Sequence, residues 1–186
     1  MNRPPGSAAR TSSDVSHETS EQPHSVAELR RAAGAVPDPE LPVISLAELG
    51  VLRDVRLLDG GRTAEVELTP TYTGCPALEA MAEDIRRALH TADPRLARVS
   101  VRTVLSPPWS TDDITEEGRR KLAAAGIAPP RRPGPARGPV PVALAIRCPR
   151  CGSTDTELIS RFSSTACKAL RRCRTCREPF DHVKEV

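Results

Sequence analysis

The chain has 186 residues, of which 38% are hydrophobic and only 2% are aromatic, and its formal net charge is +3. This length suits one ordinary domain plus a small module, because globular domains cluster near about 100 to 150 residues. The small charge and scarce aromatic residues argue against a stacking platform for single-stranded nucleic acid, and the sequence offers neither an apolar window of about 18 residues nor a secretory h-region, so we expect a cytoplasmic protein without a membrane span.

The N-terminal quarter predicts a tail, a helix and a rigid loop. Residues 1–24 are rich in Ser, Pro, Glu and His with few apolar side chains, which predicts disorder. Residues 25–28 (Ser-Val-Ala-Glu) fit a capping box, so a helix should run from there to about Ala33 and end at Gly34. Three prolines in residues 36–42 fix φ and remove donors, which predicts a rigid loop.

The central part predicts two strands, a helix and a third strand. One helical turn over 45–49 should stop at Gly50. Apolar and polar residues then alternate over 51–57 and again over 64–69, which predicts two strands, and Gly60-Gly61 supplies a hairpin turn between them. Residues 76–89 carry apolar side chains at helical spacing, and residues 99–102 alternate again. The order α-β-β-α-β predicts an α+β domain with a small mixed sheet beneath helices.

A further helix and a proline-rich segment separate this domain from the C-terminal cysteines. Asp112 or Asp113 should cap a helix over 115–125 that carries i,i+4 ion pairs between Glu116 and Arg120 and between Glu117 and Lys121. The segment after it is dense in proline and predicts a semi-rigid spacer. The predicted organisation is a disordered tail (1–24), an α+β domain (25–127), a proline-rich linker (128–142) and a zinc ribbon (143–186).

Four of the six cysteines form two CxxC pairs, which are Cys148 with Cys151 and Cys173 with Cys176. Two residues between thiolates let one tight turn present both sulfurs to one ion, and two such turns complete a tetrahedron. We interpret the quartet as a closed structural zinc site whose metal binding helps to fold a ribbon with little core of its own. A rubredoxin-like iron site uses the same ligands and stays open as an alternative.

The other two cysteines carry weaker signals. Cys75 lies at a strand-to-helix junction, where backbone N–H groups and the helix dipole favour a thiolate, so it is a metal ligand, a nucleophile or a small buried cap residue. Cys167 has no CxxC partner, and we expect a buried thiol that binds no metal. Asp38 and Glu40 flank a proline in the rigid loop, and we expect both carboxylates to be solvated.

Two further patterns support only weak functional hypotheses. None of the four histidines is well placed for a Cys-His hydrolase. The stretch from Arg161 to Arg177 holds six cations and no acid, and these could neutralise the metal site, contact phosphates or face solvent.

The motifs together resemble a known family, the D subunit of the multicomponent phenylacetyl-CoA epoxidase, across nearly everything beyond the tail. The N-terminal motifs alone are similar to a broader family of α+β domains associated with iron-sulfur cluster assembly. The matching stretches are residues 36–40 (Val-Pro-Asp-Pro-Glu), 69–77 (Thr-Pro-Thr-Tyr-Thr-Gly-Cys-Pro-Ala), 108–109 (Pro-Trp), 148–151 (Cys-Pro-Arg-Cys), 164–170 (Ser-Thr-Ala-Cys-Lys-Ala-Leu) and 176–181 (Cys-Arg-Glu-Pro-Phe-Asp).

This resemblance implies an accessory, non-catalytic subunit in aerobic phenylacetate degradation that assists assembly or repair of a metal centre. Its partners would be the other epoxidase subunits. Cys75 becomes the candidate for handling iron or an iron-sulfur cluster transiently, with Asp38, Glu40, Thr73 and Gly74 as the supporting loop residues. Alternatives are a general iron-sulfur cluster carrier and, less favoured, a nucleic-acid-binding zinc-ribbon protein. The sequence also leaves open a homodimer in which Cys75 of two chains shares a site.

Overall fold

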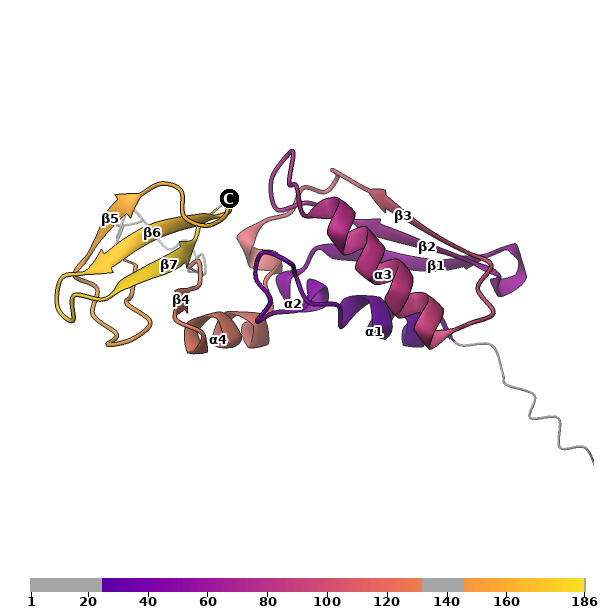
Figure 1. The fold of residues 1–186 in the computed structure, drawn as a ribbon, viewed down its shortest axis with the longest axis horizontal. Coiled ribbons are helices and arrows are strands. Elements are labelled where there is room, and N and C mark those ends of the chain that lie inside the picture. The colour runs from indigo at the N-terminus through magenta and orange to yellow at the C-terminus, as the bar shows by residue number, and fades with distance from the viewer. Residues whose placement is uncertain (1–24, 132–145, 186) are drawn as a thin grey trace, which may run out of the picture.

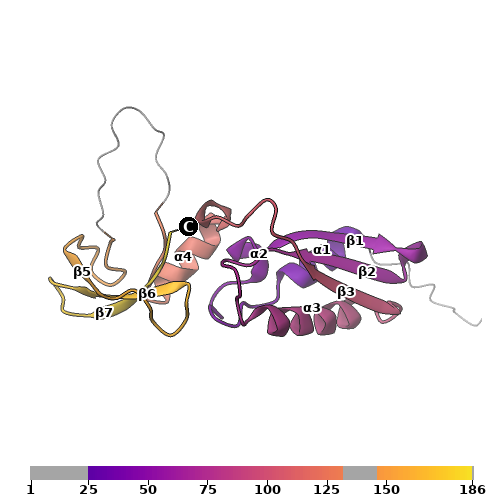
Figure 2. The ribbon, with the colours of Figure 1, turned by 90° about the horizontal axis from the view of Figure 1, so that it is seen from above.

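The computed structural model describes residues 25–131 and 146–185 of the chain. The predicted tail and most of the predicted linker lie outside the described residues. Two small sheets lie at opposite ends of an elongated molecule, with a helix of the connecting segment between them (Figures 1 and 2). Among the described residues, no helix has the length and apolar character needed to cross a bilayer.

The N-terminal domain is the predicted α+β layer. Its strands are ordered β1-β2-β3, with β1 antiparallel and β3 parallel to β2. The parallel pair needs a crossover, which α3 supplies, and α1 packs beside α3 on the sheet (Figure 1). The elements are α1 (Val26–Gly34), α2 (Leu46–Leu49), β1 (Leu52–Leu58), the 3₁₀ turn η1 (Asp59–Gly61), β2 (Thr63–Leu68), α3 (Leu78–Ala92) and β3 (Arg98–Thr103).

Local sequence signals explain where the first helices begin and end. Ser25 and Glu28 form the predicted capping box of α1, and Ser45 caps α2 in the same way with Glu48. α2 ends at Gly50, whose φ of +78° lies in the left-handed region. A Cβ at this glycine would lie 2.4 Å from the carbonyl oxygen of Asp113, so the residue is fixed by both conformation and space.

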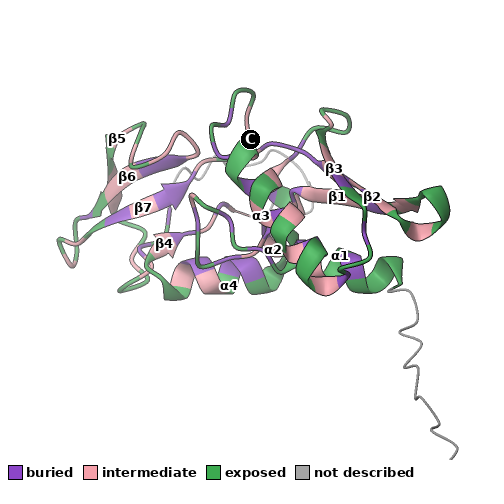
Figure 3. Cartoon of the chain, turned by 45° about the vertical axis from the view of Figure 1, so that its right-hand side comes forward, coloured by how far each residue is buried: buried purple, intermediate pink, exposed green. Residues whose placement is uncertain are grey.

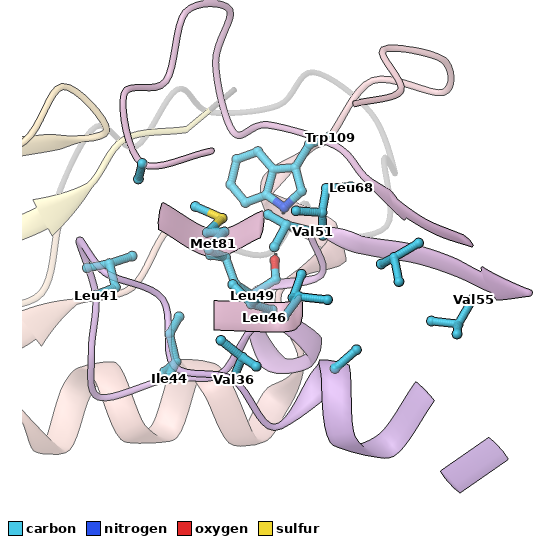
Figure 4. Packing of buried hydrophobic residues seen from close by; sticks show 14 of the residues in the cluster. Val36, Leu41, Ile44, Leu46, Leu49, Val51, Val55, Leu68, Met81 and Trp109 are labelled. Carbon is cyan, nitrogen blue, oxygen red and sulfur yellow. Dashed lines mark hydrogen bonds between the residues drawn. The ribbon is translucent and has the colours of Figure 1, made fainter. Parts of the chain in front are cut away.

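The core of this domain is aliphatic, as the composition predicts. Every second residue of β2 is buried, as are residues on one face of α1 and of α3 (Figure 3). These residues belong to one hydrophobic cluster. Trp109 is the aromatic exception: its indole Nε1 donates to the carbonyl oxygen of Leu49 at 2.9 Å, and it lies near Met81 at one end of the core (Figure 4). The core therefore reaches from the sheet to the segment that leads into the second domain.

The second sheet is ordered β4-β7-β6-β5, and it includes a strand from before the proline-rich segment. β4 pairs in parallel with β7, so the segment after α4 is part of the ribbon sheet although it lies at the predicted boundary between the α+β domain and the linker. The elements are the 3₁₀ turn η2 (Thr111–Asp113), α4 (Glu116–Ala124), β4 (Ile127–Ala128), β5 (Thr156–Ser160), β6 (Lys168–Cys173) and β7 (Pro179–Val183).

The predicted cap and ion pairs of α4 need correction. The hydroxyl of Thr115, rather than Asp112 or Asp113, accepts the N–H of Gly118 at the start of α4. Arg120 bonds Glu117 one turn earlier in the helix, and Lys121 bonds Glu48 of α2 at 2.6 Å. Tertiary packing of α4 on α2 brings Glu48 within reach, which helical spacing alone could not indicate.

Candidate functional site

The four ribbon cysteines converge on one point at the end of the second sheet. Cys148 and Cys151 lie on the turn before β5, and Cys173 and Cys176 lie at the turn between β6 and β7. Their sulfur atoms all lie within 4.8 Å of one another. The quartet is therefore a metal-binding cluster assembled from two CxxC turns.

The spacing of these sulfurs fits a tetrahedral ion. The distance between the Sγ atoms is 3.7 Å for Cys148 and Cys176 and 3.5 Å for Cys151 and Cys173. Four thiolates at about 2.3 Å from a central zinc ion would lie about 3.8 Å from each other. The four ligands leave no open coordination position, so a bound ion would stabilise the ribbon rather than activate a substrate.

Three of the six cations in the basic run of the ribbon pair with acidic side chains of the ribbon itself. Arg172 and Arg174 both bond Glu157 on the neighbouring strand, and Lys168 lies 3.5 Å from Asp181. The acids come from outside the run, which is why the sequence segment looked purely cationic. The sheet thus removes much of the basic surface that a phosphate backbone would require.

A second site lies where the ribbon meets the N-terminal domain. A cavity of about 210 Å³ is lined by residues of both domains, including Cys75 from one and Cys167 from the other. Three of the chain's four aromatic residues, Tyr72, Trp109 and Phe162, also line it. We refer to this space as the junction cavity.

Cys75 is buried in the wall of the junction cavity, and its pKa corrects the expectation of a favoured thiolate. Burial raises the pKa of the Cys75 thiol, and the carboxylates of Glu40 and Asp38 act in the same direction. The backbone N–H groups of Ala77 and Leu78 at the start of α3 oppose this increase without overcoming it. The protonated thiol is therefore the resting form at neutral pH.

Asp38 is not the solvated loop residue that we expected. Its side chain is buried, and its Oδ1 accepts the N–H groups of Glu40 at 2.9 Å and Leu41 at 2.7 Å. Burial raises the pKa of this carboxyl group, although the two backbone bonds counteract the shift. Asp38 thus shapes the loop that carries Glu40 and itself lines the junction cavity.

Glu40 and Cys167 meet across the domain junction. The Cys167 thiol donates to Glu40 Oε2 at 3.5 Å and lies 3.1 Å from the hydroxyl oxygen of Thr165. Burial and the nearby Glu40 raise the pKa of Cys167 to about 11. Cys167 lies outside the ribbon quartet, as predicted, but it is half-buried and faces a cavity rather than a packed core.

The two remaining predicted loop residues stand apart from the cavity lining. Thr73 and Gly74 are exposed on the turn before Cys75, and Gly74 has a φ of +85° with open space around it. They shape the turn that positions Cys75.

Sequence reasoning missed Tyr72, Trp109 and Phe162 as cavity residues, and the scarcity of aromatic residues in the chain was a signal that could have singled them out.

Comparisons with known proteins agree with this two-domain arrangement. Residues 27–102 match the model described as iron-sulfur cluster assembly protein, and residues 133–184 match the model described as PaaD zinc beta ribbon domain. A curated Escherichia coli (strain K12) protein, the D subunit of a putative 1,2-phenylacetyl-CoA epoxidase, is 43% identical over 162 residues, which cover 87% of this chain and 94% of that protein.

Two solved structures resemble the N-terminal part. A domain of unknown function from Bacillus anthracis is 30% identical and covers 52% of this chain and 90% of its own, with a TM-score of 0.48. A Mycobacterium tuberculosis protein, described as associated with [Fe-S] complex assembly and repair, is 35% identical and covers 54% of this chain and 84% of its own, with a TM-score of 0.31.

Proposed function

The chain belongs to the family of phenylacetyl-CoA epoxidase D subunits, and on this premise we propose that it is an accessory, non-catalytic subunit that assists assembly or repair of a metal centre in the epoxidase complex. Its partners are then the other subunits of that complex, and its place is the cytoplasm. The single observation that carries the proposal is the junction cavity, because it gathers thiol and carboxylate donors in a protected space. Thiolate and carboxylate groups are ligands for divalent transition metals.

The side chains around Cys75 support a binding role over a catalytic one. Among the described residues, no histidine lines the junction cavity, because His90 is exposed near the end of α3 and His182 packs within the ribbon. Burial raises the pKa of the Cys75 thiol and the nearby carboxylates of Glu40 and Asp38 raise it further, so this thiol is a poor nucleophile at neutral pH. A metal ion, by contrast, displaces that proton as it binds.

The ribbon has a different part in this proposal. Zinc is the ion that we assign to its four thiolates, since the closed tetrahedral set suits an ion without redox chemistry. The bound zinc ion would stabilise the folded ribbon, and the folded ribbon holds Cys167 and Phe162 against the N-terminal domain. The metal that passes to the partner, iron or an iron-sulfur cluster, is cargo and binds elsewhere.

Growth and metal content test the proposal together. Deleting the gene should abolish growth on phenylacetate and leave the oxygenase without its full metal content, and a wild-type copy should restore both. A Cys75→Ser copy should fail to restore them although it accumulates to the normal level. Normal growth of the deletion strain together with a fully metallated oxygenase would reject the proposal.

A general iron-sulfur cluster carrier is a second candidate, favoured by the family model that matches residues 27–102. It predicts that several cluster enzymes lose activity in the deletion strain, even during growth on substrates other than phenylacetate. Restriction of the defect to the epoxidase favours the first candidate. The internal pairing of Arg172, Arg174 and Lys168 gives no support to the nucleic-acid alternative.

A further inference from the structure

We propose that the junction cavity binds one ferrous ion in transit, held by the thiolates of Cys75 and Cys167 together with the carboxylate of Glu40. This inference rests on the proposed function and goes beyond it, because it makes the ribbon domain a direct contributor to the transfer site. On binding, two S–H bonds are replaced by two S–Fe bonds and two protons leave to solvent. The step involves no change in oxidation state.

The first support is that donors from both domains line one cavity. Cys75 lies in the turn before α3, Glu40 lies in the rigid loop after α1, and Cys167 lies in the loop before β6. The hydrogen bond between Cys167 and Glu40 places the ribbon thiol beside a carboxylate of the other domain. A second thiol is thus supplied within one chain, so sharing Cys75 between two copies is unnecessary.

The second support is the chemistry of the donor set. Two soft sulfurs and one hard oxygen suit a divalent transition metal, whereas calcium and magnesium prefer oxygen ligands alone. Asp38 lies behind Glu40 in the same loop and adds negative potential. Two cations lie near the donors. Lys184 lines the cavity, with its Nζ 4.6 Å from the centre of the Phe162 ring. Lys168 Nζ bonds the backbone carbonyl of Glu40 at 3.4 Å and lies 3.5 Å from Asp181, so its charge is already paired.

The third support is the size and lining of the space. A cavity of about 210 Å³ has room for an ion with a partial hydration shell. Drug-sized ligands need about 300 to 1,000 Å³, so a coenzyme A ester would not fit inside. The rings of Tyr72, Trp109 and Phe162 would shield an ion that is easily oxidised.

The three junction donors are not preassembled in the way the ribbon quartet is. Among the described residues, the ribbon quartet is the one set of three or more His, Cys, Asp or Glu side chains whose ligand atoms lie within 4.8 Å of one another. The three junction donors therefore must approach each other to bind an ion. Phe162 is exposed on the loop that carries Cys167, and a loop that closes over cargo must also open to release it. This distinguishes a transfer site from the closed ribbon.

Cobalt(II) is the probe for this site, used on the full chain with zinc in the ribbon and without oxygen. Absorption from sulfur-to-cobalt charge transfer counts the bound thiolates, and quenching of Trp109, the chain's one tryptophan, reports cavity occupancy. The variants are Cys75→Ser, Cys167→Ser and Glu40→Gln. Ile159→Ala is the control, because it changes an exposed side chain of the ribbon that does not line the cavity and keeps every donor.

The wild type should bind one cobalt ion beyond its zinc, with absorption for two thiolates and quenched Trp109. Each cysteine variant should lose about half of that absorption and bind at least about tenfold more weakly, with zinc content unchanged. Glu40→Gln should keep the absorption but weaken binding, and Ile159→Ala should retain both the absorption and the affinity. Cys167→Ala provides a second variant should the serine disturb the fold.

Two results would overturn this inference. One is a Cys167→Ser protein that binds cobalt with wild-type absorption and affinity, and the other is a wild type that binds no cobalt beyond the ribbon. The first result would leave the proposed function standing, provided that Cys75→Ser still fails to support oxygenase metallation.

Discussion

Cys167 and Glu40 are 127 residues apart in the chain, yet the thiol of one donates to the carboxylate of the other at 3.5 Å. The contact depends on the next residue, Lys168, whose buried ammonium group bonds the backbone carbonyl of Glu40 and the carboxylate of Asp181. Lys168 thus ties the ribbon loop to the rigid loop of the N-terminal domain. Substitutions that remove the ion pair of Lys168 therefore test whether the two domains pack against each other in this way.

Asp181→Asn should destabilise the protein, because it leaves the Lys168 ammonium group buried without a carboxylate. The Lys168 side chain is only 7% exposed, whereas Asp181 is 25% exposed, so we expect a loss of about 2 kcal/mol in the free energy of unfolding. Urea denaturation measures it. Asp155→Asn is the control, since its ion pair with Arg174 is exposed and should contribute less than about 1 kcal/mol. Equal losses of unfolding free energy in the two variants would contradict a buried ion pair between Lys168 and Asp181.

Gly50→Ala should be far more costly than Gly60→Ala, although both glycines have positive φ. At Gly60 the added methyl group meets open space, so we expect about 1 kcal/mol from backbone strain alone. At Gly50 the same strain is joined by a clash with the Asp113 carbonyl, for a total of about 3 kcal/mol or more. Thermal unfolding of the two variants provides the comparison, and similar midpoints would show that α2 and η2 do not pack as described.

Removing one ribbon ligand should release the metal and unfold the ribbon while the N-terminal helices persist. In Cys151→Ser the zinc affinity should fall by at least about tenfold, since even the loss of a supporting residue has an effect of this size. Metal analysis and circular dichroism measure the two consequences. Cys167→Ser serves as the matched control and should retain its zinc. Zinc loss in both variants would mean that Cys167 belongs to the ribbon site.

His182 should make the protein sensitive to mild acid. Burial, with a smaller contribution from Arg171 and Arg131 against Glu185, lowers the pKa of His182 from 6.5 to about 4. The unfolded chain therefore binds this proton more readily, so the stability contributed by neutral His182 is present above about pH 6.5 and is lost as the pH falls toward 4. The full loss is about 3 kcal/mol.

His182→Leu should remove this part of the pH dependence. Urea midpoints of wild type and variant, measured between pH 4 and pH 7, should diverge below pH 6.5 in favour of leucine. Acid release of the ribbon metal affects both proteins and cancels in the comparison. Parallel curves for the two proteins would show that His182 titrates normally.

The sequence by itself determined the local elements and the ribbon quartet. The capping box of α1, the alternation in β2 and the two CxxC turns are short-range patterns, and each depends on residues within a few positions of one another. The motifs of both domains were also sufficient to suggest the family. None of these signals required knowledge of which segments meet in space.

Only the tertiary structure decided which residues share the junction cavity. Burial of Asp38, the approach of Cys167 to Glu40 and the gathering of three aromatic rings each depend on how the ribbon packs against the first domain. The raised pKa of Cys75 has the same origin, because desolvation outweighs the local helix N-terminus. Long-range packing and desolvation leave no periodic trace in a single sequence, and they turned two separate thiols into one candidate site.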